Sequence, residues 1–265
     1  MIDTHCHIDD PCYRQDLDAV IRRQKDGGVE MILVPGVNLE SCKTVPEVCC
    51  KYPCYLRPAL GLHPEDVAAD WQDVLGQIRE TVFHYSELFP ESSPLVAIGE
   101  IGLDYHFSTE FKQEQQEVFR MQLEWAIELN LPVMIHSRDA TEDTLRIIRE
   151  YHGKSGGKLL GVMHCYSGSR EIAMEYVKMG WKIGIGGVVT FKNSKLGETL
   201  KGVPLESLVL ETDAPYMAPV PHRGETNESR WMLYVAEKLS EVYGVAKNDV
   251  FESTNCAAKA LFLRK

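Results

Sequence analysis

The chain has 265 residues, a formal net charge of −11, 44% hydrophobic and 25% charged residues, which is the composition of an ordinary soluble globular protein. No apolar run approaches the roughly 18 residues that cross a bilayer. The N-terminus shows no basic and apolar leader, so we expect a cytoplasmic protein without membrane contact. The negative charge excludes general electrostatic attraction to long nucleic acid, so any phosphate ligand must be held locally by cations or metal.

Eight cysteines are spread over this long chain, and without a leader the expectation is reduced thiols rather than a disulfide framework. A structural zinc site is the alternative for the group Cys42, Cys49, Cys50 and Cys54. The group lacks paired C-x-x-C spacing, which disfavours that alternative.

Short apolar runs rich in Val, Ile and Leu alternate with longer helical patterns. The runs cover residues 1–8, 30–36, 55–63, 95–104, 131–138, 159–166, 181–189 and 208–215. Near-continuous apolar runs of this length are typical of parallel strands that are buried on both faces. Strand runs that alternate with helices predict an α/β fold, a (β/α)8 TIM barrel, in a single domain over residues 1–265. An open doubly wound sheet is the alternative.

Polar side chains fall in the late part of these apolar runs. His5 and His7 lie in the first run, and residues two apart in a strand point to the same face. Other runs carry His63, Glu100, Asp104, His136, His164 and Asp213. A buried imidazole or carboxylate is costly unless it is paired or ligated. Their shared displacement toward one strand end therefore predicts a metal site at the mouth of the barrel.

The candidate ligands outnumber what one tetrahedral ion requires. They are His5, His7, Glu100, His136, His164 and Asp213. Two divalent ions about 3.5–4 Å apart, bridged by a carboxylate, would use all of them, and Glu100 is the best bridge because it lies between the two groups of histidines. Mixed imidazole and carboxylate ligation favours zinc, manganese or iron, leaves magnesium less favoured and disfavours calcium.

Seven blocks of the sequence carry a specific resemblance. They read DTHCH at 3–7, GLHP at 61–64, GEIGLDYH at 99–106, MIHSRDA at 134–140, HCYSGS at 164–169, LETDAPY at 210–216 and NCAAKALF at 255–262. In this order the blocks resemble the TatD family of metal-dependent deoxyribonucleases, a branch of the amidohydrolase-like barrels. The resemblance implies a (β/α)8 barrel that hydrolyses DNA phosphodiesters, in the 3′ to 5′ direction on single strands.

The resemblance also implies a role for each matching residue. His5, His7 and Asp213 would hold one ion, His136 and His164 the other, and Glu100 would bridge them. On chemical grounds Asp213 would also accept the proton of the attacking water, because it would be both a ligand and a neighbour of the nucleophile. Asp213 and Glu100 are the predicted catalytic residues. The implied substrate-binding residues are His63, Asp104, Tyr105, Arg138, Glu211 and Arg223.

One departure from the family pattern concerns the grip on DNA. Thr226 and Ser229 stand where many relatives carry a second arginine and a proline, so one cation near Asn227 is missing while Arg223 remains. Three functions therefore stay open: a nuclease that acts on DNA strand ends, a hydrolase of small phosphoesters, lactones or amides, and a non-catalytic metal-binding scaffold. For each of them we expect a monomer.

Overall fold

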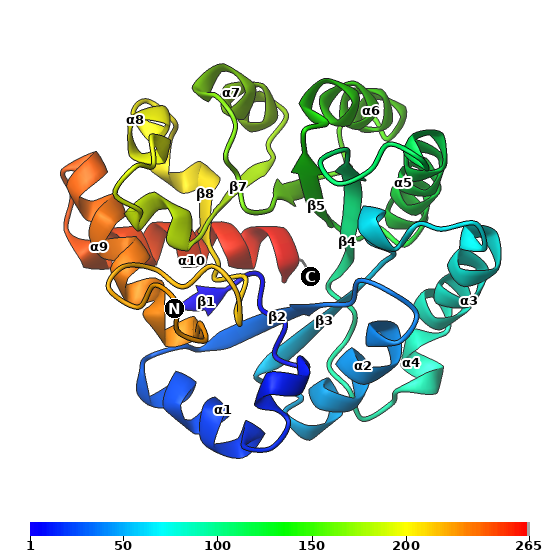
Figure 1. Ribbon diagram of the computed structural model, residues 1–265, viewed down its shortest axis with the longest axis horizontal. Helices are drawn as coiled ribbons and strands as arrows, with labels where there is room; N and C mark the ends of the chain where they lie inside the picture. Colours follow the sequence, from blue (N-terminus) through cyan, green and yellow to red (C-terminus); the bar gives the residue numbers. More distant parts are fainter. Residues whose placement is uncertain (264–265) are drawn as a thin grey trace. The chain divides into compact units, whose positions relative to one another are not determined.

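The computed structural model describes residues 1–263. Within this range the parallel strands follow the sheet order β1 to β8, and helices follow every strand in the chain, which confirms the predicted (β/α)8 barrel class (Figure 1). The strands are β1 (Ile2–Asp3), β2 (Met31–Pro35), β3 (Leu56–Leu60), β4 (Ala97–Asp104), β5 (Val133–Arg138), β6 (Gly161–Met163), β7 (Lys182–Ile185) and β8 (Leu208–Leu210). The α-helices are α1 (Leu17–Asp26), α2 (Ser41–Lys51), α3 (Trp71–Phe83), α4 (Tyr85–Leu88), α5 (Lys112–Glu128), α6 (Thr141–Lys154), α7 (Arg170–Lys178), α8 (Leu196–Leu200), α9 (Met232–Tyr243) and α10 (Lys247–Phe262).

Two compact units make up the chain, and the single domain over residues 1–265 stays a prediction. One unit is Pro35–His164, which contains β3 to β6. Its strand β4 is buried along its whole length, α5 packs on β4 and α6 packs on β5 (Figure 1). Both helices bury apolar side chains, such as Phe119 and Ile148. Continuous burial on both faces explains why β4 reads as an almost unbroken apolar run.

The other unit joins Met1–Val34 to the chain from Cys165 onward. Within it β1 pairs with β2 and β7 pairs with β8, while α10 packs against both β1 and β8. The Ile2 N–H donates to Asn255 Oδ1 on α10 at 2.9 Å, so the start of the chain is held by its last helix. This anchoring fixes the residues that follow β1.

Six of the predicted site residues lie beyond the strands in which the sequence places them, and His7 and Glu211 are two of them. The strands β1, β3, β6 and β8 end before His5, His63, His164 and Asp213, respectively. Backbone hydrogen bonds continue past these ends, for example from His164 N to Ile135 O at 2.9 Å. These polar residues thus lie just after the ends of the strands. An imidazole or carboxylate is tolerated there more easily than in the buried interior of a strand.

All eight cysteines are thiols outside any disulfide, and no group of potential metal ligands within residues 1–263 includes two of them. The alternative zinc site around Cys42 therefore finds no support. Among the described helices, none is long and apolar enough to traverse a bilayer.

Candidate metal centre

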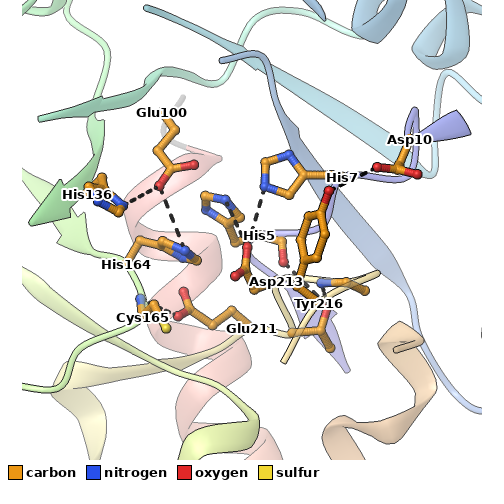
Figure 2. Close-up of polar contacts among 12 residues, drawn as sticks. His5, His7, Asp10, Glu100, His136, His164, Cys165, Glu211, Asp213 and Tyr216 are labelled. Carbon is orange, nitrogen blue, oxygen red and sulfur yellow. Dashed lines mark hydrogen bonds and ion pairs between the residues drawn. The ribbon is translucent and has the colours of Figure 1, made fainter. Parts of the chain in front are cut away.

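His5, His7 and Asp213 form one group of potential ligands, which we call the His5 cluster. The Asp213 Oδ1 atom lies 3.4 Å from His7 Nε2 and 3.9 Å from His5 Nε2, as Figure 2 shows for this group. The backbone holds the three together, because His7 N donates to Ala214 O at 2.8 Å and Asp213 N donates to His5 O at 2.9 Å. Asp213 has a left-handed backbone with φ 58°, a conformation that Asp and Asn tolerate best among residues other than glycine.

Asp3 ties the two segments of the His5 cluster together, a role that sequence reasoning missed. Its Oδ1 atom accepts the N–H groups of His5 and Thr212, both at 3.1 Å, and its Oδ2 atom accepts the Thr212 hydroxyl at 2.6 Å. Burial raises the pKa of Asp3 to about 7, although these hydrogen bonds lower it. The only signal in the sequence is an aspartate at the start of an apolar run, two residues before a candidate ligand.

Glu100 owes its position to an irregularity in β4. The register pairs Ile98 with Val133 and Ile101 with Ile135, so β4 has one residue more than β5 at this point. Such a bulge re-aims a side chain, and here it lies beside Glu100. Two residues later Gly102, with φ 145°, allows close contact with β5, since a Cβ atom there would overlap the carbonyl oxygen of His136.

Three imidazoles surround the Glu100 carboxylate, and we call this group the Glu100 cluster. The Glu100 Oε1 atom lies 3.2 Å from His136 Nδ1, 3.6 Å from His63 Nε2 and 3.9 Å from His164 Nε2. Figure 2 shows His136 and His164 pointing toward this carboxylate. Glu100 is only 4% exposed, so its charge lies in a low-dielectric environment in which cationic partners bind strongly.

Asp104 fixes the orientation of the His136 ring. Its Oδ2 atom lies 2.7 Å from His136 Nε2, and its Oδ1 atom accepts the His106 N–H at 2.8 Å. The sequence predicts a substrate contact for Asp104, whereas a buried carboxylate with both oxygens engaged fits an orienting partner better. Burial lowers the pKa of His136, but the bonds to Asp104 and Glu100 outweigh it and raise the pKa to about 9.

Replacing Asp104 by Asn is expected to weaken divalent metal binding by about 10- to 100-fold, because His136 loses the partner that orients it and makes it basic. At pH 7 the wild-type ring carries a proton on Nδ1 that a metal must displace, since its pKa is about 9. Isothermal titration in buffers of different ionisation enthalpy measures both the affinity and the released proton. Equal affinity and equal proton release in the variant would contradict the orienting role.

His63 differs from the other histidines in its hydrogen bonding. Its Nδ1 atom accepts the Glu65 N–H at 3.2 Å, so a neutral ring must carry its proton on Nε2, the atom that faces Glu100. An Nε2–H group donates a hydrogen bond and has no lone pair for a metal. This tautomer favours a supporting or substrate contact for His63, in line with the sequence-based expectation, over direct ligation.

Glu211 is buried and holds the segment that follows His164. Its Oε1 atom accepts the Cys165 N–H at 2.6 Å, as Figure 2 shows, and Glu211 is 1% exposed. Gly184 on β7 makes room for it, because a Cβ atom there would overlap the Glu211 carboxylate. The sequence predicts substrate binding for Glu211, and its position fits better with shaping the backbone at Cys165.

Replacing Gly184 by Ala is expected to lower the free energy of unfolding by about 1–3 kcal/mol, because the added methyl group displaces a packed carboxylate. Urea unfolding measures this loss. Gly76→Ala in α3 is the matched control: its Cβ atom would meet nothing within 4 Å, so the change is expected to be neutral or stabilising by up to about 1 kcal/mol. Similar effects at the two glycines would refute the packing argument.

The remaining predicted substrate residues have different surroundings. Tyr105 is half-buried, and its hydroxyl donates to Asp143 at 3.1 Å. Arg138 and Arg223 are exposed, and each guanidinium lies over an aromatic ring, Phe107 at 4.9 Å and Phe191 at 3.9 Å. The arginines are therefore free to meet an anion, while Tyr105 is already engaged.

Comparison with known proteins agrees with these features. Residues 2–263 match the family described as TatD related DNase. The chain is 39% identical over 263 residues to the metal-dependent hydrolase YabD of Bacillus subtilis, covering 99% of this chain and 98% of that protein. It is 33% identical to YcfH of Escherichia coli over 271 residues, covering 99% and 95%. The crystal structure of the TatD homologue YjjV of E. coli superposes with a TM-score of 0.88 at 30% identity, covering 100% and 98%.

Proposed function

The chain belongs to the TatD family of metal-dependent hydrolases, and on that premise we propose that it cleaves DNA phosphodiester bonds from a strand end, 3′ to 5′ on single strands. The observation that carries the proposal is the pair of clusters in which imidazole nitrogens lie within 3.2–3.9 Å of a carboxylate oxygen. This donor chemistry fits zinc or manganese better than magnesium. We propose one divalent ion for each cluster.

His5, His7 and Asp213 would hold one ion, and His136, His164 and Glu100 the other. Bound there, the ions would supply Lewis acidity toward a phosphodiester and a nucleophile at neutral pH. Asp213, whose side chain is 21% exposed, can accept a proton from water on the open side of its cluster. Arg138 and Arg223 can offset the charge on the phosphate oxygens. A bridging role for Glu100 stays a prediction.

The second candidate is a hydrolase of small phosphoesters, lactones or amides that uses the same ligands. The net charge of −11 favours it, because a long polyanion is repelled from an acidic surface. The absence of an arginine at position 226 points the same way, because Thr226 is exposed there and brings no positive charge to the surface.

Metal-loaded protein incubated with end-labelled single-stranded DNA, alongside a panel of small esters, decides between these functions. Stepwise shortening from the 3′ end supports the nuclease. Turnover of a small ester far above that of DNA would favour the alternative, and loss of neither substrate with any divalent ion would refute both. Elemental analysis of the protein and of a His136→Ala, His164→Ala double variant counts the ions: retention of about half the metal supports two.

A further inference from the structure

Phe107 is the most exposed large hydrophobic residue among residues 1–263, with 70% of its surface accessible to solvent. It lies three residues after the end of β4, in the loop that leads to α5. Loops at this end of the strands carry the substrate contacts in (β/α)8 enzymes. Its position therefore relates the exposed ring to the candidate site, although a single exposed apolar side chain is common in itself.

Two neighbours hold the Phe107 ring in place. The His106 ring meets it edge-on, with centroids 4.8 Å apart and an interplanar angle of 82°, and His106 Nδ1 is itself bonded to Asp139 Oδ2 at 2.8 Å. The Arg138 guanidinium lies 4.9 Å from the Phe107 centroid, from the last position of β5. The ring is thus exposed to solvent with an imidazole at its edge and a cation over its face.

Arg138 brings a cation to the same place. Within residues 1–263 no hydrogen bond or salt bridge of its guanidinium is found. The guanidinium lies over the Phe107 ring, and its charge interacts electrostatically with Asp104. Arginine binds phosphate through a planar fork of N–H groups and stacks on aromatic faces at the same time. A nucleotide offers both of these partners, a phosphate and a flat base, joined through its sugar.

Tyr105, the aromatic residue among the implied substrate-binding residues, is occupied by other contacts. Lys112 Nζ lies 4.2 Å from its ring centroid, and Gln116 donates to its hydroxyl at 2.9 Å. Both rings have a cation over one face, but Tyr105 is half-buried and its hydroxyl is engaged, whereas Phe107 is 70% exposed. Phe107 is consequently the better platform in this unit.

We propose that Phe107 and Arg138 form a binding subsite for one unpaired nucleobase, which stacks on Phe107, and for an adjacent phosphate, which pairs with Arg138. The inference rests on the proposed action on DNA and deepens it, because it makes single-stranded substrate a requirement of the site. Stacking on an aromatic ring accepts any base, so the subsite selects for an unpaired base but not for its identity.

Equilibrium binding tests the subsite independently of catalysis. The ligands are a short oligothymidylate with phosphorothioate linkages, which slow hydrolysis, and the same strand with abasic residues at its 3′ end. Wild-type protein is expected to bind the base-bearing strand about 5- to 100-fold more tightly. Phe107→Ala should abolish this preference and Phe107→Trp should restore it. Leu88→Ala, which removes another exposed apolar side chain, 55% accessible, should leave the preference intact.

Salt dependence separates the two residues of the subsite. Arg138→Gln is expected to reduce the slope of log affinity against log salt concentration by about 0.7, the value for one phosphate contact on a single strand. Phe107→Ala should lower affinity without changing that slope. The subsite would be overturned if wild-type protein bound the two strands equally, or if Phe107→Ala lost the same affinity for both strands. It would also be overturned if wild-type protein formed a dimer that Phe107→Ala dissociates, because the ring would then serve a contact between two copies of the chain.

The binding result does not depend on hydrolysis. If wild-type protein cleaves no phosphodiester with any divalent ion, the proposed function fails. The comparison of base-bearing and abasic strands then still shows whether a base stacks on Phe107. If DNA is cleaved but abasic and base-bearing strands bind equally, the subsite fails and the function stands.

Discussion

Replacing Asp213 by Asn is expected to lower kcat for phosphodiester hydrolysis by about 10²- to 10⁴-fold, the range for loss of a proton-transfer group. Asn keeps an oxygen at Oδ1 and tolerates the left-handed backbone, φ 58°, so the fold and the contacts at 3.4 and 3.9 Å to the two imidazoles can persist. What disappears is the negative charge that attracts a cation and accepts a proton. Steady-state kinetics at saturating metal, together with elemental analysis, measures the effect.

Asp73→Asn on α3 provides the matched control, because it removes an exposed aspartate outside both clusters. Its kcat should equal that of the wild-type protein. A slow Asp213→Asn variant that keeps its metal supports proton acceptance. Unchanged kcat would contradict any role for Asp213 in the reaction, and loss of metal in parallel with activity would reduce that role to ligation.

The strands could be predicted from the sequence because burial on both faces leaves a simple signature. The apolar runs 95–104 and 131–138 contain β4 (Ala97–Asp104) and β5 (Val133–Arg138), and their only charged or imidazole side chains stand out. A glutamate or histidine inside such a run needs a partner, and this need alone pointed to Glu100 and His136. The family blocks added the roles of these residues.

Which polar residues contact one another could not be predicted in the same way. Asp104 and His136 are 32 positions apart, and their contact at 2.7 Å depends on the register that pairs Gly102 with His136 and Asp104 with Arg138. That register includes an extra residue in β4, and no local pattern in the sequence predicts such a bulge. The sequence therefore grouped Asp104 with the substrate residues, although it supports His136.

The burial of Asp3 and the exposure of Phe107 were hidden for the same reason. Asp3 is fully buried because the segment around Thr212, more than 200 residues away in the chain, closes over it with two hydrogen bonds. Phe107 precedes α5, which begins only at Lys112, and its ring lies outside the core. The burial of Asp3 and the exposure of Phe107 both depend on tertiary structure, which no local pattern in the sequence reveals.

Replacing Glu100 by Gln is expected to weaken metal binding by at least about 100-fold, the upper end of the effect of losing a supporting partner, because it removes a ligand itself. The carboxylate oxygen of Glu100 lies within 3.9 Å of three imidazole nitrogens, and a neutral amide there lacks the negative charge that attracts a divalent cation. Activity should fall with metal content. Competition titration with a chelator measures the dissociation constant.

The response to added metal distinguishes this variant from Asp213→Asn. Because Glu100→Gln lowers the affinity for metal, a large excess of zinc or manganese should recover part of its activity. Asp213→Asn is assayed at saturating metal, so it should gain no activity from a further excess. Glu128→Gln at the end of α5 is the control, since Glu128 is exposed. Wild-type metal content and kcat in Glu100→Gln would remove the Glu100 cluster from the mechanism and leave the His5 cluster to account for hydrolysis alone.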